Sequence, residues 1–369
     1  MKGKFALKAC AAAAGLVFAS MAQAQSSVTL YGLLDGGLIY TSKTLGANGQ
    51  NAGHQYSFTD SGLSPSNFGM EGTEDLGGGL KAEFKLESGI NIGTGGFNDS
   101  NGNFFGRQAY VGLKDGFGEV KAGLQYSPFF LALYDNDPRG LAQTGGSLMM
   151  YLDNVVATGI FTPNAVSYTS PVLWGFQGSA LYSFGGVAGD FQDARQYSAS
   201  LKYDNGTLAI NASFFDSNAN TTGTPISPVP TQQEFEGRQL GASYKIGKLT
   251  AKASFVSYKY GVVSNNVYGG GVDFLALPQV DLNAGVWYEQ DRHDTTNHSL
   301  LAGAGVVPGI LLAYAAGRAM EGILAGVQPG DALTFASAVG LCVLMTVLGS
   351  LVPALRAVRI DPISAIRSE

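Results

Sequence analysis

Hydrophobic and charged residues alternate strictly between residues 80 and 87. Leu80, Ala82, Phe84 and Leu86 share one face of this segment, and Lys81, Glu83, Lys85 and Glu87 share the other. A period of two is typical of a strand whose faces meet different environments. Glycines occupy positions 77–79, and glycine reaches positive φ without steric cost, so the sequence predicts a tight hairpin here. Both a soluble sheet and a membrane barrel with an apolar exterior and a charged lumen fit this pattern.

Strand patterns recur along the chain, and very short turns join them in pairs. We predict strands near residues 28–40, 68–75, 80–92, 105–114, 118–126, 165–169, 176–184, 196–203, 207–215, 238–244, 249–258, 267–275 and 280–289. Another strand starts near His298, which gives about 13–14 strands. Longer loops rich in Asn, Ser, Thr and Gly separate the pairs. Short turns at one end and long loops at the other are typical of outer-membrane proteins, so we predict an all-β, antiparallel transmembrane barrel.

The N-terminus has the pattern of a cleaved export signal. A basic head with three lysines precedes a short apolar run over residues 9–19, and Ala22-Gln23-Ala24 fits a small-x-small cleavage site. Cleavage there would leave Gln25 as the first mature residue. The apolar run is too short to anchor the chain in a membrane.

Composition narrows the chemistry that we expect. The net charge of −6 over 369 residues gives no reason to expect nucleic acid as a partner. The three histidines form no cluster with the spacing of metal ligands, and no phosphate-binding loop or nucleophile elbow occurs. The two cysteines, Cys10 and Cys342, build no disulfide framework in the exported body. We therefore expect no cofactor, no metal and no enzymatic activity.

Several motifs occur in order between about residues 25 and 300. They are VTLYG at 28–32, GTEDLGGGLKA at 72–82, FGRQAYVGL at 105–113, SYTSP at 167–171 and DLNAGVWY at 281–288. In these motifs the chain resembles the general, trimeric porins of the Gram-negative outer membrane, in their beta-proteobacterial branch. The resemblance implies a sixteen-stranded porin-like barrel in outer-membrane lipid and assembly as a homotrimer. It also implies passive diffusion of small hydrophilic solutes and ions.

The family resemblance further implies that the third extracellular loop folds into the lumen as a constriction. Residues 127–163 fall on that loop, and its charged residues are Asp135, Asp137, Arg139 and Asp153. Strand residues with lumen parity would line the facing wall, and the candidates are Lys81, Glu83, Lys85, Glu87, Glu119 and Lys121. Arg107 has lipid-face parity and is expected near the rim. Because acids and lysines share the wall, the direction of charge selectivity stays open.

The pattern changes near residue 300. Residues 300–317 and 332–355 are continuously apolar without alternation, so they predict two membrane-spanning helices. The segment 304–369, with GVQP at 326–329 and PALRAVRIDPISAIR at 353–367, resembles the C-terminal end of ABC-transporter permeases of the macrolide-export and lipoprotein-release type. We divide the chain into a signal peptide (1–24), a C-terminally truncated porin barrel (25–300) and a permease-like helical tail (301–369).

Two interpretations of this junction stay open. Either the reading frame joins two genes near residues 300–305 and yields a non-functional chimera, or a real fusion uses the helices to close or plug the barrel. Two other function classes also stay open. A membrane component of an ABC-type exporter would need more helices and an ATPase partner. A barrel enzyme would need a catalytic Ser/His/Asp set at the rim, and the scarcity of histidine speaks against it.

Overall fold

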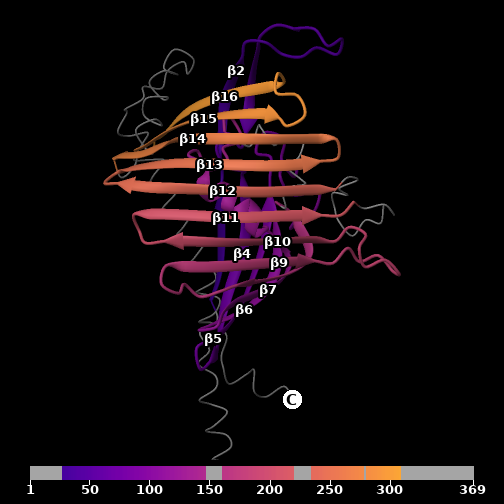
Figure 1. The fold of residues 1–369 in the computed structure, drawn as a ribbon, viewed down its shortest axis with the longest axis vertical. Helices are drawn as coiled ribbons and strands as arrows, with labels where there is room; N and C mark the ends of the chain where they lie inside the picture. Colours follow the sequence, from indigo (N-terminus) through magenta and orange to yellow (C-terminus); the bar gives the residue numbers. More distant parts are fainter. Residues whose placement is uncertain (1–26, 147–159, 220–233, 278–279, 309–369) are drawn as a thin grey trace, which may run out of the picture. The chain divides into compact units, whose positions relative to one another are not determined.

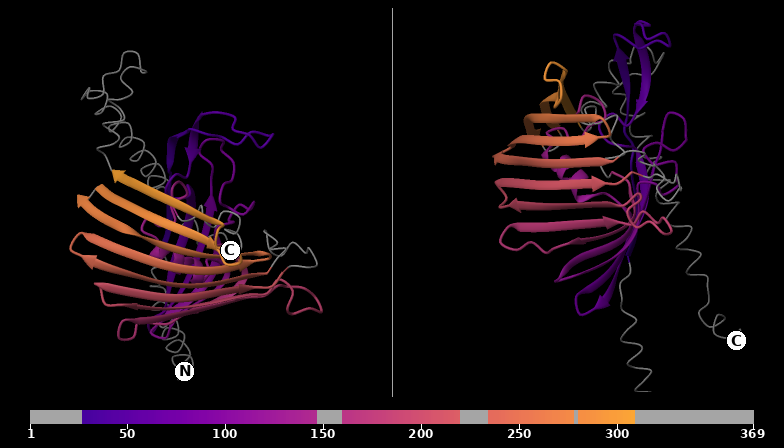
Figure 2. Two further views of the ribbon diagram at one scale, coloured as in Figure 1. Left: turned by 45° about the horizontal axis from the view of Figure 1, so that its top comes forward. Right: turned by 45° about the vertical axis from the view of Figure 1, so that its right-hand side comes forward.

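The computed structural model describes residues 27–146, 160–219, 234–277 and 280–308 (Figure 1). The predicted signal peptide and Asp153 lie outside these residues. So do the predicted second apolar helix at 332–355 and nearly all of the permease-like segment. In the part that is described, strands make up most of the regular structure (Figure 2).

Sixteen strands are described, and fourteen of them form one sheet in the order β1-β4-β5-β6-β7-β8-β9-β10-β11-β12-β13-β14-β15-β16. Their bounds are β1 Ser27–Leu33, β4 Asn67–Gly77, β5 Leu80–Gly89, β6 Gln108–Asp115, β7 Gly118–Gln125, β8 Thr162–Thr169, β9 Phe176–Ser183, β10 Gln196–Asp204, β11 Leu208–Ser217, β12 Phe235–Ile246, β13 Leu249–Tyr260, β14 Val263–Leu277, β15 Val280–Asp291 and β16 His298–Pro308. The remaining two, β2 (Gly36–Thr41) and β3 (Gln55–Asp60), pair with each other in a separate sheet. The prediction of an antiparallel, porin-like sheet of about fourteen strands is confirmed, whereas β3 was not predicted.

The alternation at 80–87 becomes β5, and its register fixes which residues share a face. Phe84 lies opposite Gly72 on β4 and Val111 on β6, whereas Lys85 lies opposite Glu71 and Tyr110. The turn before β5 uses Gly78 and Gly79 with φ of 67° and 97°, which side chains with a Cβ rarely adopt. The predicted hairpin is therefore confirmed.

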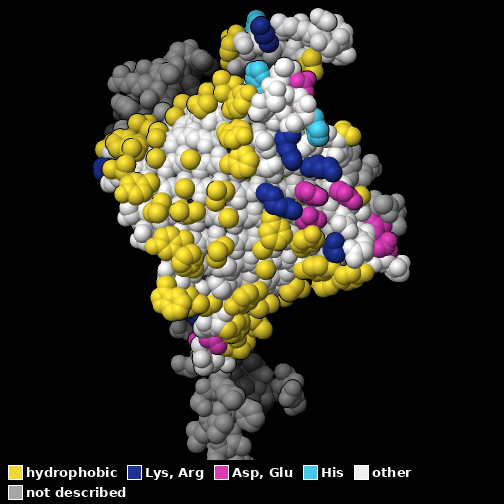
Figure 3. Space-filling view, in the orientation of Figure 1, with side chains coloured by type: hydrophobic (Ala, Val, Ile, Leu, Met, Phe, Trp, Pro, Cys, Tyr) yellow, Lys and Arg dark blue, Asp and Glu magenta, His cyan; other side chains and the backbone are white. Residues whose placement is uncertain are grey.

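One face of the fourteen-stranded sheet carries exposed apolar side chains on strand after strand. We call it the apolar face, and its exposed members include Val111, Val120, Ile210, Leu240 and Val286. Figure 3 shows hydrophobic side chains spread over the strands β9 to β16. Large apolar residues exposed in such numbers suit contact with lipid rather than with water.

The other face carries a helix that the sequence analysis did not predict. Helix α2 spans Pro128–Asn136 and contacts strands β9 to β13. Its start has strong local signals, because the Ser127 hydroxyl accepts a hydrogen bond from the Phe130 amide at 3.0 Å and Pro128 occupies the first turn. We call the face beneath α2 the polar face. Within the described residues, no helix has the length and apolar character needed to span a membrane.

A cluster of buried hydrophobic side chains lies between α2 and the strands. Phe129 is fully buried, and its ring centroid lies 6.3 Å from that of Phe215 and 6.2 Å from that of Phe235. Leu133 and Val256 complete the contact. Apolar residues on the polar face thus gather where α2 covers them, and this packing holds the helix to the wall.

The expected helix at 300–317 is wrong for residues 300–308, because these belong to β16. The alternation of β16 is hidden in the sequence. Leu301 packs against the buried core cluster, and Gly303 and Gly305 lie against the Gly145 backbone and the Arg139 side chain. Small or apolar residues therefore stand where other strands carry polar ones. Residue 300, the predicted barrel boundary, falls inside this strand, and residues 309–317 lie outside the described chain.

Replacing Gly237 on β12 should loosen α2. A Cβ at this position would lie 2.6 Å from Cζ of Phe129, so Gly237→Val should destabilise the fold by about 1–3 kcal/mol through overpacking. The matched control is Gly178→Val on β9, where a Cβ would meet nothing within 4 Å. Heat denaturation followed by gel mobility measures both variants. Equal midpoints for the two would contradict the packing described here.

Candidate functional site

The charged residues predicted for the wall lie on the polar face of β5 and β7. Lys85 Nζ lies 3.4 Å from Glu71 and 3.7 Å from Glu87, and Lys121 Nζ lies 2.7 Å from Glu119. The carboxyl groups of Glu83 and Glu119 lie close enough to interact electrostatically. Cations and carboxylates thus interleave along these strands, as the alternation predicted.

Glu87 differs from the other wall charges because it is buried, with 5% of its surface exposed. It accepts hydrogen bonds from Tyr31 Oη and Arg107 Nε, both at 2.7 Å, and from Tyr126 Oη at 3.2 Å. These partners come from β1 and from the residues just before β6 and just after β7. Glu87 is therefore a structural tie between strands rather than a free charge.

Arg107 lies at the end of a wall strand, but its side chain does not follow the lipid-face parity that was expected for it. Arg107 precedes β6, so strand parity does not fix its direction, and it is 8% exposed. Its guanidinium pairs with Glu87 and donates a hydrogen bond of 2.7 Å to the Tyr126 hydroxyl. Sequence alternation cannot show a side chain that turns back from the end of a strand.

The end of α2 brings two predicted acids to the polar face, where lysines meet them. Lys202 of β10 pairs with Asp135 at 2.9 Å, and Lys252 of β13 donates a hydrogen bond of 3.0 Å to the Asp137 carbonyl. The Asp137 side chain is 2% exposed, and its Oδ1 accepts from the amides of Arg139 and Leu141. Asp137 thus shapes the loop, while Asp135 meets the wall directly.

Arg139 links the same loop to the last strands of the sheet. Its Nε donates a hydrogen bond of 3.0 Å to Asn283 of β15, and Nη1 donates to the carbonyls of Thr144 and Gly145. Burial lowers the pKa of the Arg139 guanidinium, and the negative charge of Asp137 opposes that shift. The group stays charged at neutral pH, because a guanidinium is far too basic to lose its proton there.

The sequence analysis missed Lys202 and Lys252. Both stand at polar-face positions, since Lys202 alternates with Leu201 and Tyr203, and Lys252 lies two residues from Ser254. The period-two signal was present in the sequence. However, no feature of the sequence indicates that helix α2 lies over β10 and β13.

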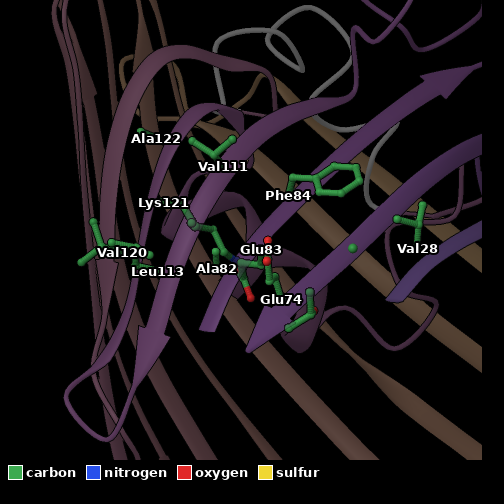
Figure 4. Close-up of a pocket in the computed structure, with 13 residues that line it drawn as sticks. Val28, Glu74, Ala82, Glu83, Phe84, Val111, Leu113, Val120, Lys121 and Ala122 are labelled. Carbon is green, nitrogen blue, oxygen red and sulfur yellow. The ribbon is translucent and has the colours of Figure 1, made fainter. Parts of the chain in front are cut away.

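A hollow of about 610 Å³ lies over β4 to β7. Most of its lining comes from apolar-face side chains, which include Val28, Phe84, Val111 and Val120 (Figure 4). The charged residues Glu74, Glu83 and Lys121 also line the hollow, so its lining is mostly but not wholly apolar. In the described residues, no group of three His, Cys, Asp or Glu side chains is placed to hold a metal ion.

Comparison with known proteins shows which protein family the chain belongs to. The Gram-negative porin family model matches residues 9–306. The chain belongs to the Gram-negative porin family. An outer membrane porin protein of Bordetella pertussis is 35% identical over 263 residues, covering 65% of this chain and 66% of that protein. Outer membrane porin protein 32 of Delftia acidovorans is 31% identical over 314 residues, covering 80% of this chain and 84% of that protein.

Solved structures agree with this assignment. An anion-selective porin from Comamonas acidovorans has a TM-score of 0.64 at 26% identity, covering 76% of this chain and 84% of that one. The Salmonella typhi OmpF shows the same fold with a TM-score of 0.52 at 14% identity, covering 75% of this chain and 85% of that one. The beta-proteobacterial porin resemblance is confirmed, and the protein is an outer-membrane porin.

Removing the Glu87 charge should destabilise the wall. Glu87→Gln leaves the buried Arg107 without its carboxylate, which costs about 3 kcal/mol in comparable buried pairs. Urea unfolding in detergent measures the loss. Glu74→Gln is the matched control, because Glu74 is exposed and its replacement should change stability by less than about 0.5 kcal/mol. If the two variants unfold at the same urea concentration, the Glu87 cluster is not a structural tie.

Proposed function

We propose that the polar face lines a water-filled channel for passive diffusion of small hydrophilic solutes and ions, with the α2 loop as its constriction. One observation carries the proposal: α2 lies against the polar face of the sheet, whereas the opposite face exposes apolar side chains. Such a division of faces suits lipid on one side and water on the other.

In this proposal the wall residues and the loop residues have different roles. Lys81, Glu83, Lys85, Glu119 and Lys121 line the channel wall, and Glu87 holds the wall strands together. From the loop, Asp135 and Arg139 face the narrow part, and Asp137 keeps the loop in shape. Asp153 stays a predicted member of the constriction, outside the described residues.

We further propose that the constriction prefers anions. Among the described residues, no ion pair within 4 Å joins Arg139 or Lys252 to a carboxylate; both donate to uncharged oxygens, and the charges of Asp137 and Asp281 act on them from farther away. Asp135, by contrast, is neutralised by Lys202. The Comamonas acidovorans porin that resembles this chain is described as anion-selective, which supports the same direction. An excess of positive charge in a narrow passage raises the local concentration of anions.

Three further hypotheses belong to this proposal. Residues 1–24 are cleaved as a signal, the chain assembles as a homotrimer in the outer membrane, and the permease-like tail takes no part in conduction. Intact mass and native gel electrophoresis of the protein from outer membranes test the first two. A variant truncated after β16 tests the third.

Reconstitution in planar lipid bilayers without ATP tests the channel itself. Stepwise conductance increments that persist in the absence of nucleotide are expected for a passive pore. A protein that inserts and produces no steps would overturn the proposal. A need for ATP would instead favour an exporter component.

Lys252→Gln should lower the anion-to-cation permeability ratio by roughly two- to five-fold, because one unit charge acts within a few ångströms of the passing ion. The reversal potential across a KCl gradient measures this ratio. Lys259→Gln is the matched control, because Lys259 lies on the same strand at an exposed apolar-face position. If the permeability ratio is unchanged in Lys252→Gln, or changes equally in both variants, the proposed anion preference is contradicted.

A further inference from the structure

Helix α2 has a free side as well as a packed one. Phe129 and Leu133 are buried against the strands, whereas Leu131 and Tyr134 keep 49% and 51% of their surface exposed. Residues three apart on a helix are neighbours on its surface, so these two side chains form one patch. The loop that narrows the proposed channel therefore presents an apolar patch as well as the charge of Asp135.

A hollow of about 190 Å³ lies beside this patch, and we call it the α2 hollow. Part of its lining consists of apolar and aromatic side chains from α2 and the loop around it, namely Phe130, Leu131, Tyr134, Leu141 and Ile160. Water in such surroundings finds few hydrogen-bond partners. An apolar solute that displaces this water is therefore favoured by the hydrophobic effect.

Another part of the lining comes from the ends of β6 and β7, where the polar groups already have partners. The Tyr126 ring lies beside Phe130, with 5.4 Å between the ring centroids. Tyr126 Oη accepts a hydrogen bond from Arg107 and donates one to Glu87, and Glu87 also pairs with Arg107. The positive charge of Arg107 is thus matched by a carboxylate, and this part of the lining offers a ring rather than a free cation.

Two further polar residues line the α2 hollow and supply hydrogen-bond acceptors. The Gln143 amide donates a hydrogen bond of 2.7 Å to the Asp99 carboxylate. A carboxylate has about four lone-pair sites, so Asp99 keeps the capacity to accept a hydroxyl group of a solute. Because Glu87 already balances Arg107, the Asp99 charge makes this small space unfavourable for a second carboxylate.

The volume of the α2 hollow suits one ring. A dry apolar cavity of about 150 Å³ holds a benzene molecule, so a hollow of about 190 Å³ has room for one ring with a small substituent. The rings of Tyr126, Phe130 and Tyr134 favour an aromatic solute, because aromatic pairs are stabilised beyond their buried area. A hydroxyl substituent would find an acceptor in Asp99, whereas a charged substituent would lose its hydration.

We propose that the α2 hollow is a binding site for neutral, single-ring aromatic solutes that carry one hydroxyl group. This inference rests on the proposed function, because the hollow bears on permeation only if the polar face lines the channel. A solute held against Leu131 and Tyr134 occupies part of the constriction, so it lowers the ion current while it is bound.

Phenol is the probe, and the full-length protein in planar lipid bilayers is the sample. Phenol added to the KCl solution should lower the conductance of each step reversibly and saturably, with half of the effect at millimolar concentration, as expected for so small a ligand. Glucose, which is polar all round, should give no saturation over the same range. Benzoate at neutral pH should need a concentration roughly three- to tenfold higher than phenol does, because its carboxylate meets Asp99 and an apolar lining.

Variants on the free side of α2 locate the effect. Leu131→Asn and Tyr134→Asn make the lining polar, so each should raise the half-blocking concentration of phenol by roughly three- to tenfold. Tyr134→Phe keeps the ring and should restore most of the block. The matched control is Tyr56→Asn on β3, an exposed aromatic residue outside the hollow, which should leave the phenol titration unchanged. Heat-modifiable mobility shows which variants have folded.

The possible outcomes separate this site from the channel itself. Conductance steps without a saturable effect of phenol would overturn the site and leave the proposed channel intact. A phenol block that is the same in both asparagine variants, or that benzoate or glucose reproduces at equal concentration, would also overturn the site. The absence of any steps would overturn the channel, and with it the site that rests on the channel.

Discussion

Every backbone amide and carbonyl of this protein that lies in the bilayer must find its hydrogen-bond partner within protein. The fourteen-stranded sheet meets this need strand by strand, through the ladder from β1 to β16. The pleat of the strands then sets the direction of each side chain, because successive residues of a strand point to opposite faces of the sheet. The apolar face contacts lipid, and the polar face contacts water or helix α2.

The same constraint explains why the α2 loop is held so firmly. A loop that turns toward the polar face carries its own backbone groups, and these need partners there. Phe129 anchors the helix by apolar packing, while Lys252 and Arg139 bind carbonyls of the loop. These lysine and arginine side chains therefore do two things at once: they satisfy the loop backbone and leave positive charge beside it.

How much of this the sequence predicts depends on how each part is encoded. Strands such as β5, β7 and β13 show local alternation and follow short turns, so the sequence predicts where they lie. Their faces were predicted residue by residue for β5 and for Glu119 and Lys121 of β7, but not for β13. Helix α2 has a clear Ser127-Pro128 start, but its charged and apolar residues lack a regular period. Lys202 and Lys252 are ordinary strand lysines until the fold places α2 above them. β16 was misread as a helix because the loop packs against Gly303 and Gly305, which removes the polar residues that mark a strand.

Cysteine scanning along β13 is the most direct measurement of the central claim that the two faces meet water and lipid. Each residue from Leu249 to Phe255, before the part of the strand that α2 covers, is replaced in turn by cysteine and exposed to a membrane-impermeant, water-soluble thiol reagent in the outer membrane. Labelling with a period of two is expected, with Thr250, Lys252 and Ser254 reactive and Ala251, Ala253 and Phe255 protected. Labelling without that period, or with the opposite phase, would contradict the assignment of the polar face to the channel.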